Sequence, residues 1–138
     1  MMPAMRLHHA GVSVADLDAM VAWYGAALGL AVEDRFEVPD AGLRGAMMAA
    51  PGALRVELLE RAGSEPVARD LSSPPAALLV RGWGHIALEV EDLDGTFARL
   101  VEAGAAVVWD PRPAPVPGMR MAYLRDPEDN LIELVAPG

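Results

Sequence analysis

A histidine and a glutamate occur twice in this chain at one separation. His9 precedes Glu57 by the same number of positions as His85 precedes Glu133. The second pair is therefore the first pair repeated at a fixed displacement along the chain. Two neutral imidazoles and two carboxylates form a ligand set that suits a divalent metal ion. We therefore predict one metal site with two ligands from each copy of a repeated unit.

The repeat extends well beyond these four residues. A period of this length that occurs only twice is too long for a solenoid and indicates two copies of one supersecondary unit. At the same displacement the further matches are Val14 with Val90, Asp16 with Asp92, Leu17 with Leu93, Asp18 with Asp94, Val32 with Val108, Asp34 with Asp110, Gly42 with Gly118, Arg44 with Arg120, Ala46 with Ala122 and Leu58 with Leu134.

The composition excludes several kinds of chemistry. The chain has no Cys and no Lys, and all eleven basic residues are Arg, so disulfides, thiolate ligands and lysine Schiff bases are excluded. A net charge of −9 argues against nucleic acid and anionic membrane surfaces as partners. With 138 residues, 53% of them hydrophobic, the chain is long enough for one compact domain or for two small halves that share a core.

No segment has the pattern of a membrane span or a secretion signal. The longest apolar stretch, 19–32, is shorter than the roughly 20 residues that a membrane helix needs, and Gly25 and Gly29 interrupt it. The N-terminus lacks the charged and then apolar pattern of a signal peptide. We expect a soluble cytoplasmic protein that acts on a small molecule.

Hydrophobic alternation and turn residues predict the same elements in each half. In the first half, Asp16 caps a helix and Gly29 ends it; in the second half, Asp92 and Gly104 do the same. The expected strands are 7–14, 30–38, 43–49 and 54–60, then 84–90, 105–109, 119–125 and 131–135, and the expected helices are 20–28 and 92–103.

These elements predict an α+β fold of two tandem βαβββ modules. The first module spans 1–61 and the second spans 82–138; the linker 62–81 is expected to carry a short helix at 66–71. The alternation of the strands turns His9, Glu57, His85 and Glu133 away from the apolar face that must cover the helix. All four side chains are therefore expected on the concave side of curled mixed sheets. His8 has the opposite parity and no counterpart in the repeat, since Gly84 stands there.

The ligand types limit the metal and its chemistry. Imidazole and carboxylate donors suit Ni²⁺, Co²⁺, Zn²⁺, Mn²⁺ or Fe²⁺. Four protein ligands in an octahedron leave two positions for water or a bidentate substrate, where the metal acts as a Lewis acid on an oxygen. A glutamate that loosens from the metal could then take a proton from the adjacent carbon. The alternative is that both glutamates lie on an open, wet sheet face as the relic of a former site.

Several segments resemble the vicinal oxygen chelate superfamily, also called the glyoxalase/bleomycin-resistance/dioxygenase family. "LHHAGVSVADLDAMVAWYGAALGL" and "RVELLE" resemble its first module, and "WGHIALEVEDLDGTFARLVEAGA" and "MAYLRDPEDNLIEL" resemble its second. The resemblance places His9, Glu57, His85 and Glu133 at the family's metal positions. Asp129 stands where Gly is usual in the "DPxGN" turn. The motifs are closest to those of glyoxalase I and methylmalonyl-CoA epimerase.

The resemblance implies a divalent-metal-dependent isomerase or lyase. Such an enzyme acts through a metal-stabilised enolate or enediolate on a small carbonyl or thioester substrate. Glu133 is the preferred proton-transfer base, with Glu57 nearly equal to it. An extradiol-type ring-cleaving dioxygenase is one alternative, although the fourth ligand Glu57 takes a position that this chemistry needs. An antibiotic-sequestering protein of the bleomycin-resistance type is the other, although such relatives generally lack the ligands.

Five further residues are candidates for the substrate pocket. Arg44 and Arg120 are equivalent in the repeat and could anchor an anionic substrate group; the alternative is a pair of solvated strand arginines. Met47, Tyr123 and Trp83 could line an apolar pocket or could simply pack in the core.

The helix within 19–28 is apolar nearly all round, which predicts a second buried surface and hence a homodimer. The superfamily pairs its modules within one chain or across a dimer interface, and the sequence leaves both arrangements open.

Overall fold

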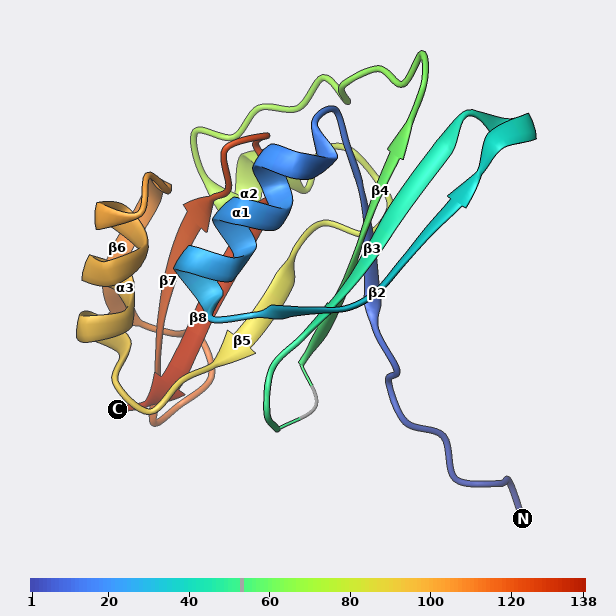
Figure 1. Cartoon of the computed structure of the whole chain (residues 1–138). Coiled ribbons are helices and arrows are strands. Elements are labelled where there is room, and N and C mark those ends of the chain that lie inside the picture. The colour runs from blue at the N-terminus through green and yellow to red at the C-terminus, as the bar shows by residue number, and fades with distance from the viewer. Residues whose placement is uncertain (53) are drawn as a thin grey trace. The chain divides into compact units, whose positions relative to one another are not determined.

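The computed structural model describes residues 1–52 and 54–138. The chain divides into two compact units, Met1–Glu65 and Pro66–Gly138, and each unit has one four-stranded sheet and one main helix (Figure 1). The elements of the first unit are β1 (Ala10–Val14), α1 (Leu17–Leu28), β2 (Ala31–Val38), the 3-10 turn η1 (Pro39–Ala41), β3 (Leu43–Ala49) and β4 (Arg55–Arg61). The elements of the second unit are α2 (Pro74–Ala77), β5 (Ile86–Glu89), α3 (Leu93–Glu102), β6 (Ala106–Pro113), β7 (Met119–Arg125) and β8 (Leu131–Pro137).

The two sheets have the same topology. Their strand orders are β1-β4-β3-β2 and β5-β8-β7-β6, with the first and last strands of each unit parallel and the other pairs antiparallel. A parallel pair requires a crossover connection. The path from β1 to β4 passes through α1 and the path from β5 to β8 passes through α3, so each unit is a βαβββ module. The predicted α+β class and tandem modules are confirmed.

Both main helices begin at the aspartates that the sequence singled out. The side chain of Asp16 accepts a hydrogen bond from the Ala19 amide, and that of Asp92 accepts one from the Gly95 amide. Each aspartate therefore satisfies one of the free amides of the first helical turn. Gly29 ends α1 in the left-handed conformation at φ 68°, as expected for a helix C-terminus.

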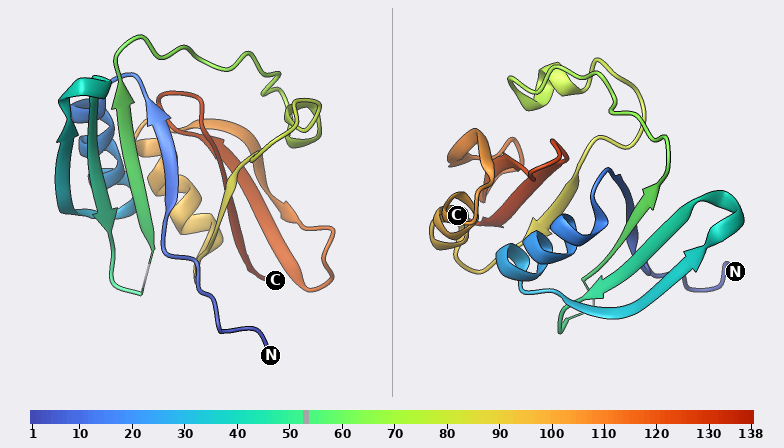
Figure 2. Two further views of the ribbon diagram at one scale, coloured as in Figure 1. Left: turned by 90° about the vertical axis from the view of Figure 1, so that its right-hand side faces the viewer. Right: turned by 45° about the horizontal axis from the view of Figure 1, so that its top comes forward.

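Each helix covers one face of the sheet in its own unit. Helix α1 packs against β3 and β4, and α3 packs against β6, β7 and β8 (Figures 1 and 2). Alternate strand residues point to this covered face and are almost fully buried; they include Met48, Val56 and Leu58 in the first unit and Leu124, Ile132 and Leu134 in the second. The opposite face of each sheet, which we call the inner face, carries the residues that alternate with these.

The segment before β5 covers part of the inner face of its own sheet. Ala77 of α2 is buried in a cluster with Met121, Tyr123 and Leu131, which all lie on that face. The short helix predicted at 66–71 is wrong, since these residues are irregular and the helix spans Pro74–Ala77. Ser73 provides the cap by accepting from the Ala76 amide, and the two prolines that follow fit a first helical turn.

No helix in the described residues is long and apolar enough to cross a membrane.

Candidate metal centre

The first histidine–glutamate pair lies on the inner face of the first unit. His9 immediately precedes β1, and Glu57 lies in the middle of β4. Their Nε2 and Oε1 atoms are 3.6 Å apart, and both side chains are partly exposed. Gly11 lies directly opposite Glu57 in the parallel pair β1–β4, and a Cβ atom on Gly11 would lie 3.7 Å from the carboxylate. Strand β1 therefore has no side chain at the position opposite Glu57.

His8 contacts the other ring nitrogen of His9. The Nδ1 atoms of the two rings are 2.8 Å apart, so a proton on one of them bridges the two residues. The Nε2 atom of His9 is then the nitrogen that faces the carboxylate. His8, which has no counterpart in the repeat, therefore lies outside the pair but contacts it.

The second pair is the counterpart of the first and is closer. His85 immediately precedes β5, Glu133 lies in β8, and the distance from Nε2 to Oε2 is 3.0 Å. The Arg69 guanidinium donates to the carbonyl oxygen of Gly84 at 2.9 Å, which fixes the backbone just before His85. Arg69 lies in the expected linker, where no sequence signal connects it with the histidine that begins the next module.

The residues opposite the two glutamates differ between the units. Met47 of β3 lies directly opposite Glu57, and Tyr123 of β7 lies directly opposite Glu133. Burial, followed by the negative charge of the nearby Glu133, raises the pKa of Tyr123 to about 12, so the phenol stays protonated near neutral pH. Both pocket candidates thus lie beside a proposed ligand.

Further aromatic rings lie next to Tyr123 on the second sheet. The ring of Tyr123 meets the ring of His85 edge to face at 5.4 Å and the ring of Trp109 at 6.1 Å. The Arg112 guanidinium stacks over Trp109 at 4.5 Å from the ring centroid. Arg112 lies in a proline-rich segment of the sequence, and its contact with Trp109 comes from the extension of β6 to Pro113.

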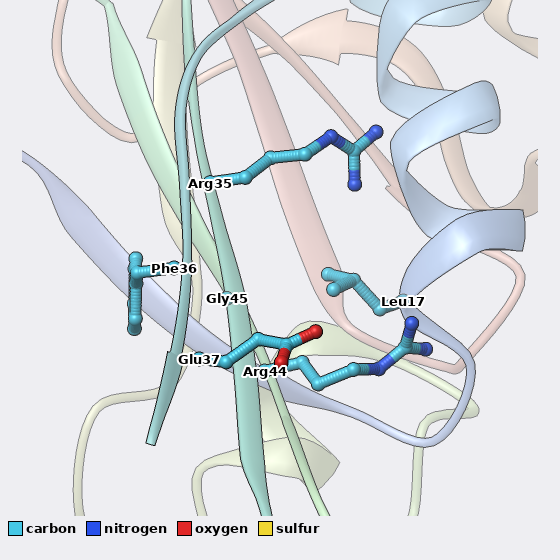
Figure 3. Close-up of a pocket in the computed structure, with 6 residues that line it drawn as sticks. All are labelled: Leu17, Arg35, Phe36, Glu37, Arg44 and Gly45. Atoms are coloured by element: carbon cyan, nitrogen blue, oxygen red, sulfur yellow. The ribbon is translucent and has the colours of Figure 1, made fainter. Parts of the chain in front are cut away.

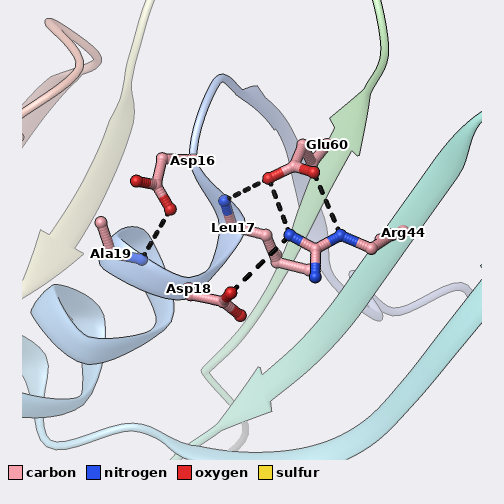
Figure 4. A network of polar contacts seen from close by, with 6 residues as sticks. All are labelled: Asp16, Leu17, Asp18, Ala19, Arg44 and Glu60. Atoms are coloured by element: carbon pink, nitrogen blue, oxygen red, sulfur yellow. Dashed lines mark hydrogen bonds and ion pairs between the residues drawn. The ribbon is translucent and has the colours of Figure 1, made fainter.

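Arg44 and Arg120 lie on the opposite faces of their sheets, those that the helices cover. Arg44 donates two hydrogen bonds to Glu60 at 3.1 and 3.0 Å and lies 3.8 Å from Asp18 (Figure 4). Arg120 makes two hydrogen bonds to Asp94, at 2.9 and 3.2 Å. These contacts favour the interpretation of both arginines as strand residues that tie the sheet to its helix.

The electrostatics of the arginine contacts agree with this interpretation. The hydrogen bond from Arg44, followed by that from the Leu17 amide, lowers the pKa of Glu60. The hydrogen bond from Arg120 likewise lowers the pKa of Asp94. Both of these carboxylates therefore remain charged near neutral pH and form ion pairs with the two guanidinium groups.

A cavity of about 280 Å³ in the first unit does not contain the pair. Its lining is Leu17, Arg35, Phe36, Glu37, Arg44 and Gly45 (Figure 3). The lining includes both arginine and glutamate side chains, so the cavity does not favour a ligand of one charge. The remaining pocket candidate, Trp83, lies two residues before His85 and is 100% exposed.

Neither unit alone offers a complete metal site. Within each unit, the described residues bring together no three His, Asp or Glu side chains that could hold a metal ion. Each pair does offer one imidazole nitrogen and one carboxylate that face each other, which is the donor combination that divalent transition metals accept. The residues present therefore fit such an ion, with two ligands available from each unit.

Comparisons with known proteins extend over nearly the whole chain. The family model described as Glyoxalase/Bleomycin resistance protein/Dioxygenase superfamily matches residues 6–134. The chain is 37% identical over 109 residues to ethylmalonyl-CoA/methylmalonyl-CoA epimerase of Cereibacter sphaeroides, covering 78% of each protein. It is 29% identical over 135 residues to a probable lactoylglutathione lyase of Synechocystis, covering 95% of each. The crystal structure of a glyoxalase family protein from Bacillus cereus aligns with a TM-score of 0.75 at 26% identity, covering 99% of this chain and 96% of that one.

Proposed function

Because the chain belongs to the glyoxalase/bleomycin resistance protein/dioxygenase superfamily, we propose that it is a divalent-metal-dependent isomerase or lyase. The substrate is a small carbonyl compound or thioester. The names of the two relatives, an epimerase of acyl-CoA thioesters and a probable lactoylglutathione lyase, support both substrate classes.

The observation that carries this proposal is the geometry of the two pairs. In each unit a histidine Nε2 atom faces a glutamate carboxylate on the inner face, at 3.6 Å in the first and 3.0 Å in the second. His9, Glu57, His85 and Glu133 would hold one Ni, Co, Zn, Mn or Fe ion. When bound, that ion supplies Lewis acidity to a carbonyl or thioester oxygen of the substrate.

Residues of the chain would bind the ion, transfer the proton and contact the substrate. His9 and His85 would bind the ion through neutral imidazole nitrogens. Glu57 or Glu133 would take the proton from the carbon next to the carbonyl. Delivery of a proton to the neighbouring carbon would isomerise the substrate, and delivery to the opposite face of the same carbon would invert it. The exposed ring of Trp83, close in sequence to His85, is available to contact the substrate.

The first experiment is elemental analysis of the protein expressed with mixed divalent metals. We expect about one metal ion per assembled site, and its loss in Glu133→Gln and in Glu57→Gln. The matched control is Glu102→Gln, which removes an exposed carboxylate at the end of α3 and should leave the metal content unchanged. If the purified protein holds no stoichiometric metal, the proposed function is wrong.

Solvent exchange tests the reaction class without a known substrate. The loaded protein is incubated in D₂O with a methylmalonyl thioester or with a glutathione hemithioacetal, and proton NMR follows the signal of the carbon-bound proton. Loss of that signal with one substrate, abolished by a chelator and in Glu57→Gln or Glu133→Gln, supports metal-dependent proton transfer at these residues. A metal-loaded protein that exchanges neither substrate contradicts the proposed reaction, and iron as the bound metal would direct assays to ring cleavage.

We also propose that the protein is a homodimer, since the α1 segment is apolar nearly all round. Light scattering after size exclusion should give about twice the chain mass of 14.6 kDa. A mass equal to one chain contradicts the dimer and leaves the metal centre within a single chain.

A further inference from the structure

The cavity of the first unit is lined by two charged side chains that lack an ion-pair partner among the described residues. It lies between the edge strand β2, the neighbouring strand β3 and Leu17 at the start of α1. Arg35 and Glu37 of β2 lie opposite Ala46 and Arg44 of β3, on the face that α1 covers. Neither Arg35 nor Glu37 forms a hydrogen bond or ion pair with another residue that the structure describes.

The third charged group of the lining is already paired. Arg44 donates two hydrogen bonds to Glu60, at 3.1 and 3.0 Å, so its charge is balanced within the protein. The side chains of Arg35, Glu37 and Arg44 extend from the strands on the side where Leu17 lies (Figure 3). The cavity therefore presents one cation and one anion for a ligand, together with the apolar side chain of Leu17.

The size of the cavity limits what it can hold. Its volume of about 280 Å³ lies just below the roughly 300–1,000 Å³ of pockets for drug-sized ligands, so it suits a smaller molecule. A ligand with one carboxylate and one ammonium group can pair with Arg35 and Glu37 together. A ligand with a single charge leaves one of these two side chains without a partner.

We propose that this cavity binds a small zwitterion of the amino-acid type, with its carboxylate at Arg35, its ammonium group at Glu37 and a small apolar side chain against Leu17. The site goes beyond the proposed function, because its lining contains no residue of either histidine–glutamate pair. Arg35 and Glu37 are exposed, so each ion pair contributes modestly and we expect a dissociation constant in the millimolar range.

The principal test is a titration of the ¹⁵N-labelled protein with L-alanine, followed by NMR. We expect saturable shifts of the amide resonances of Leu17 and Gly45, which line the cavity. Propionate is L-alanine without the ammonium group, and ethylammonium is L-alanine without the carboxylate. Each should bind about fivefold more weakly than L-alanine or worse, the effect expected for the loss of one exposed ion pair.

Two substitutions assign the two charges separately. Arg35→Gln and Glu37→Gln should each weaken L-alanine binding about fivefold. Arg35→Gln should also weaken propionate binding, whereas Glu37→Gln should not. The matched controls are Arg99→Gln and Glu102→Gln, which remove one exposed charge of each sign from α3 and should leave the L-alanine affinity unchanged.

Each contrary result overturns the inference. The absence of saturable shifts with L-alanine up to about 50 mM, well above the expected dissociation constant, would show that the cavity binds no such zwitterion. Propionate or ethylammonium binding as tightly as L-alanine would show that only one charge is recognised. Unchanged L-alanine affinity in both Arg35→Gln and Glu37→Gln would place the ligand elsewhere. All of these results are independent of metal binding at the histidine–glutamate pairs.

Discussion

Arg44 and Glu60 form a two-pronged ion pair directly across β3 and β4. The same carboxylate accepts a third hydrogen bond, at 2.8 Å, from the amide of Leu17, the first residue of α1 (Figure 4). One glutamate thus joins the third and fourth strands of the first unit to the start of its helix. The repeat places Ala136 at the equivalent position, so this connection is specific to the first unit.

The ion pair predicts how stability depends on pH. The hydrogen bond from Arg44 lowers the pKa of Glu60 below its ordinary value of 4.5. Its stabilising contribution is therefore fully present above about pH 4.5 and is lost as the pH falls through the lower folded-state pKa. Urea unfolding of the original protein and Glu60→Gln from pH 7 to pH 3 should show a stability difference that narrows at the acidic end. Glu65→Gln, an exposed carboxylate outside the described ion pairs, should show a constant difference, and a constant difference for Glu60→Gln would contradict the prediction.

Phe36 restricts the residue at position 45 on the inner face of the first sheet. Phe36 and Gly45 lie opposite each other in β2 and β3, and a Cβ atom on Gly45 would overlap the Phe36 ring (Figure 3). Gly45→Ala should lower the free energy of unfolding by about 1–3 kcal/mol, the usual cost of overpacking. Combining Gly45→Ala with Phe36→Leu should recover part of this loss, since the smaller side chain can yield. Equal losses in the single and double variants would show that the ring is not the cause.

Metal binding should raise the thermal stability of the folded protein. An ion that binds the folded state and not the unfolded state stabilises it by about 2.7 kcal/mol when its free concentration is 100 times the dissociation constant. Differential scanning fluorimetry with and without a chelator should therefore show a metal-dependent rise in the melting temperature. His85→Ala and His9→Ala should each abolish most of this rise, while Arg120→Gln, which breaks the ion pair with Asp94 on the helix-covered face, should retain it. A rise that survives both histidine substitutions would place the ion elsewhere.

Asp129 carries a backbone conformation that favours glycine. It has φ 66° in the turn between β7 and β8, where the buried carboxylate of Asp126 accepts from the amides of Glu128 and Asn130. Asp129→Ala should cost about 1 kcal/mol, because alanine lacks the side-chain hydrogen bonding that eases the left-handed region for aspartate. Asp129→Gly should remain within about 0.5 kcal/mol of the original, since it relieves strain but loses the exposed contact with Arg125. Denaturant unfolding of the three proteins ranks them, and an alanine variant as stable as the original would remove the strain argument.

The repeat made most of the fold predictable from the sequence. Because His9, Asp16 and Leu58 recur at one fixed displacement, each ambiguous segment could be compared with its counterpart, and the strands 43–49 and 119–125 were predicted to the residue. Where the repeat stops, prediction was poorer. The segment 62–81 has no counterpart, and its short helix forms later in the chain than expected, because the Ser-Pro-Pro cap begins it.

The candidate site was predictable in its residue types but not in its neighbours. Strand parity predicted a common face for His85 and Glu133, since alternation alone decides the face. The position of Tyr123 opposite Glu133 depends on the β7–β8 register, and the Arg69 contact with the backbone before His85 depends on the path of an irregular segment. Neither follows from local patterns. The same holds for Arg44 and Arg120, whose carboxylate partners Glu60 and Asp94 are distant in sequence.

Equal ligands with unequal neighbours bear on how a duplicated site can change. Met47 lies opposite Glu57 and Tyr123 lies opposite Glu133, so the repeat keeps the two glutamates while the residues beside them differ. Because these neighbours belong to strands that contribute no proposed ligand, each can be replaced without changing the ligand set, and each copy of the repeated unit can acquire its own surroundings.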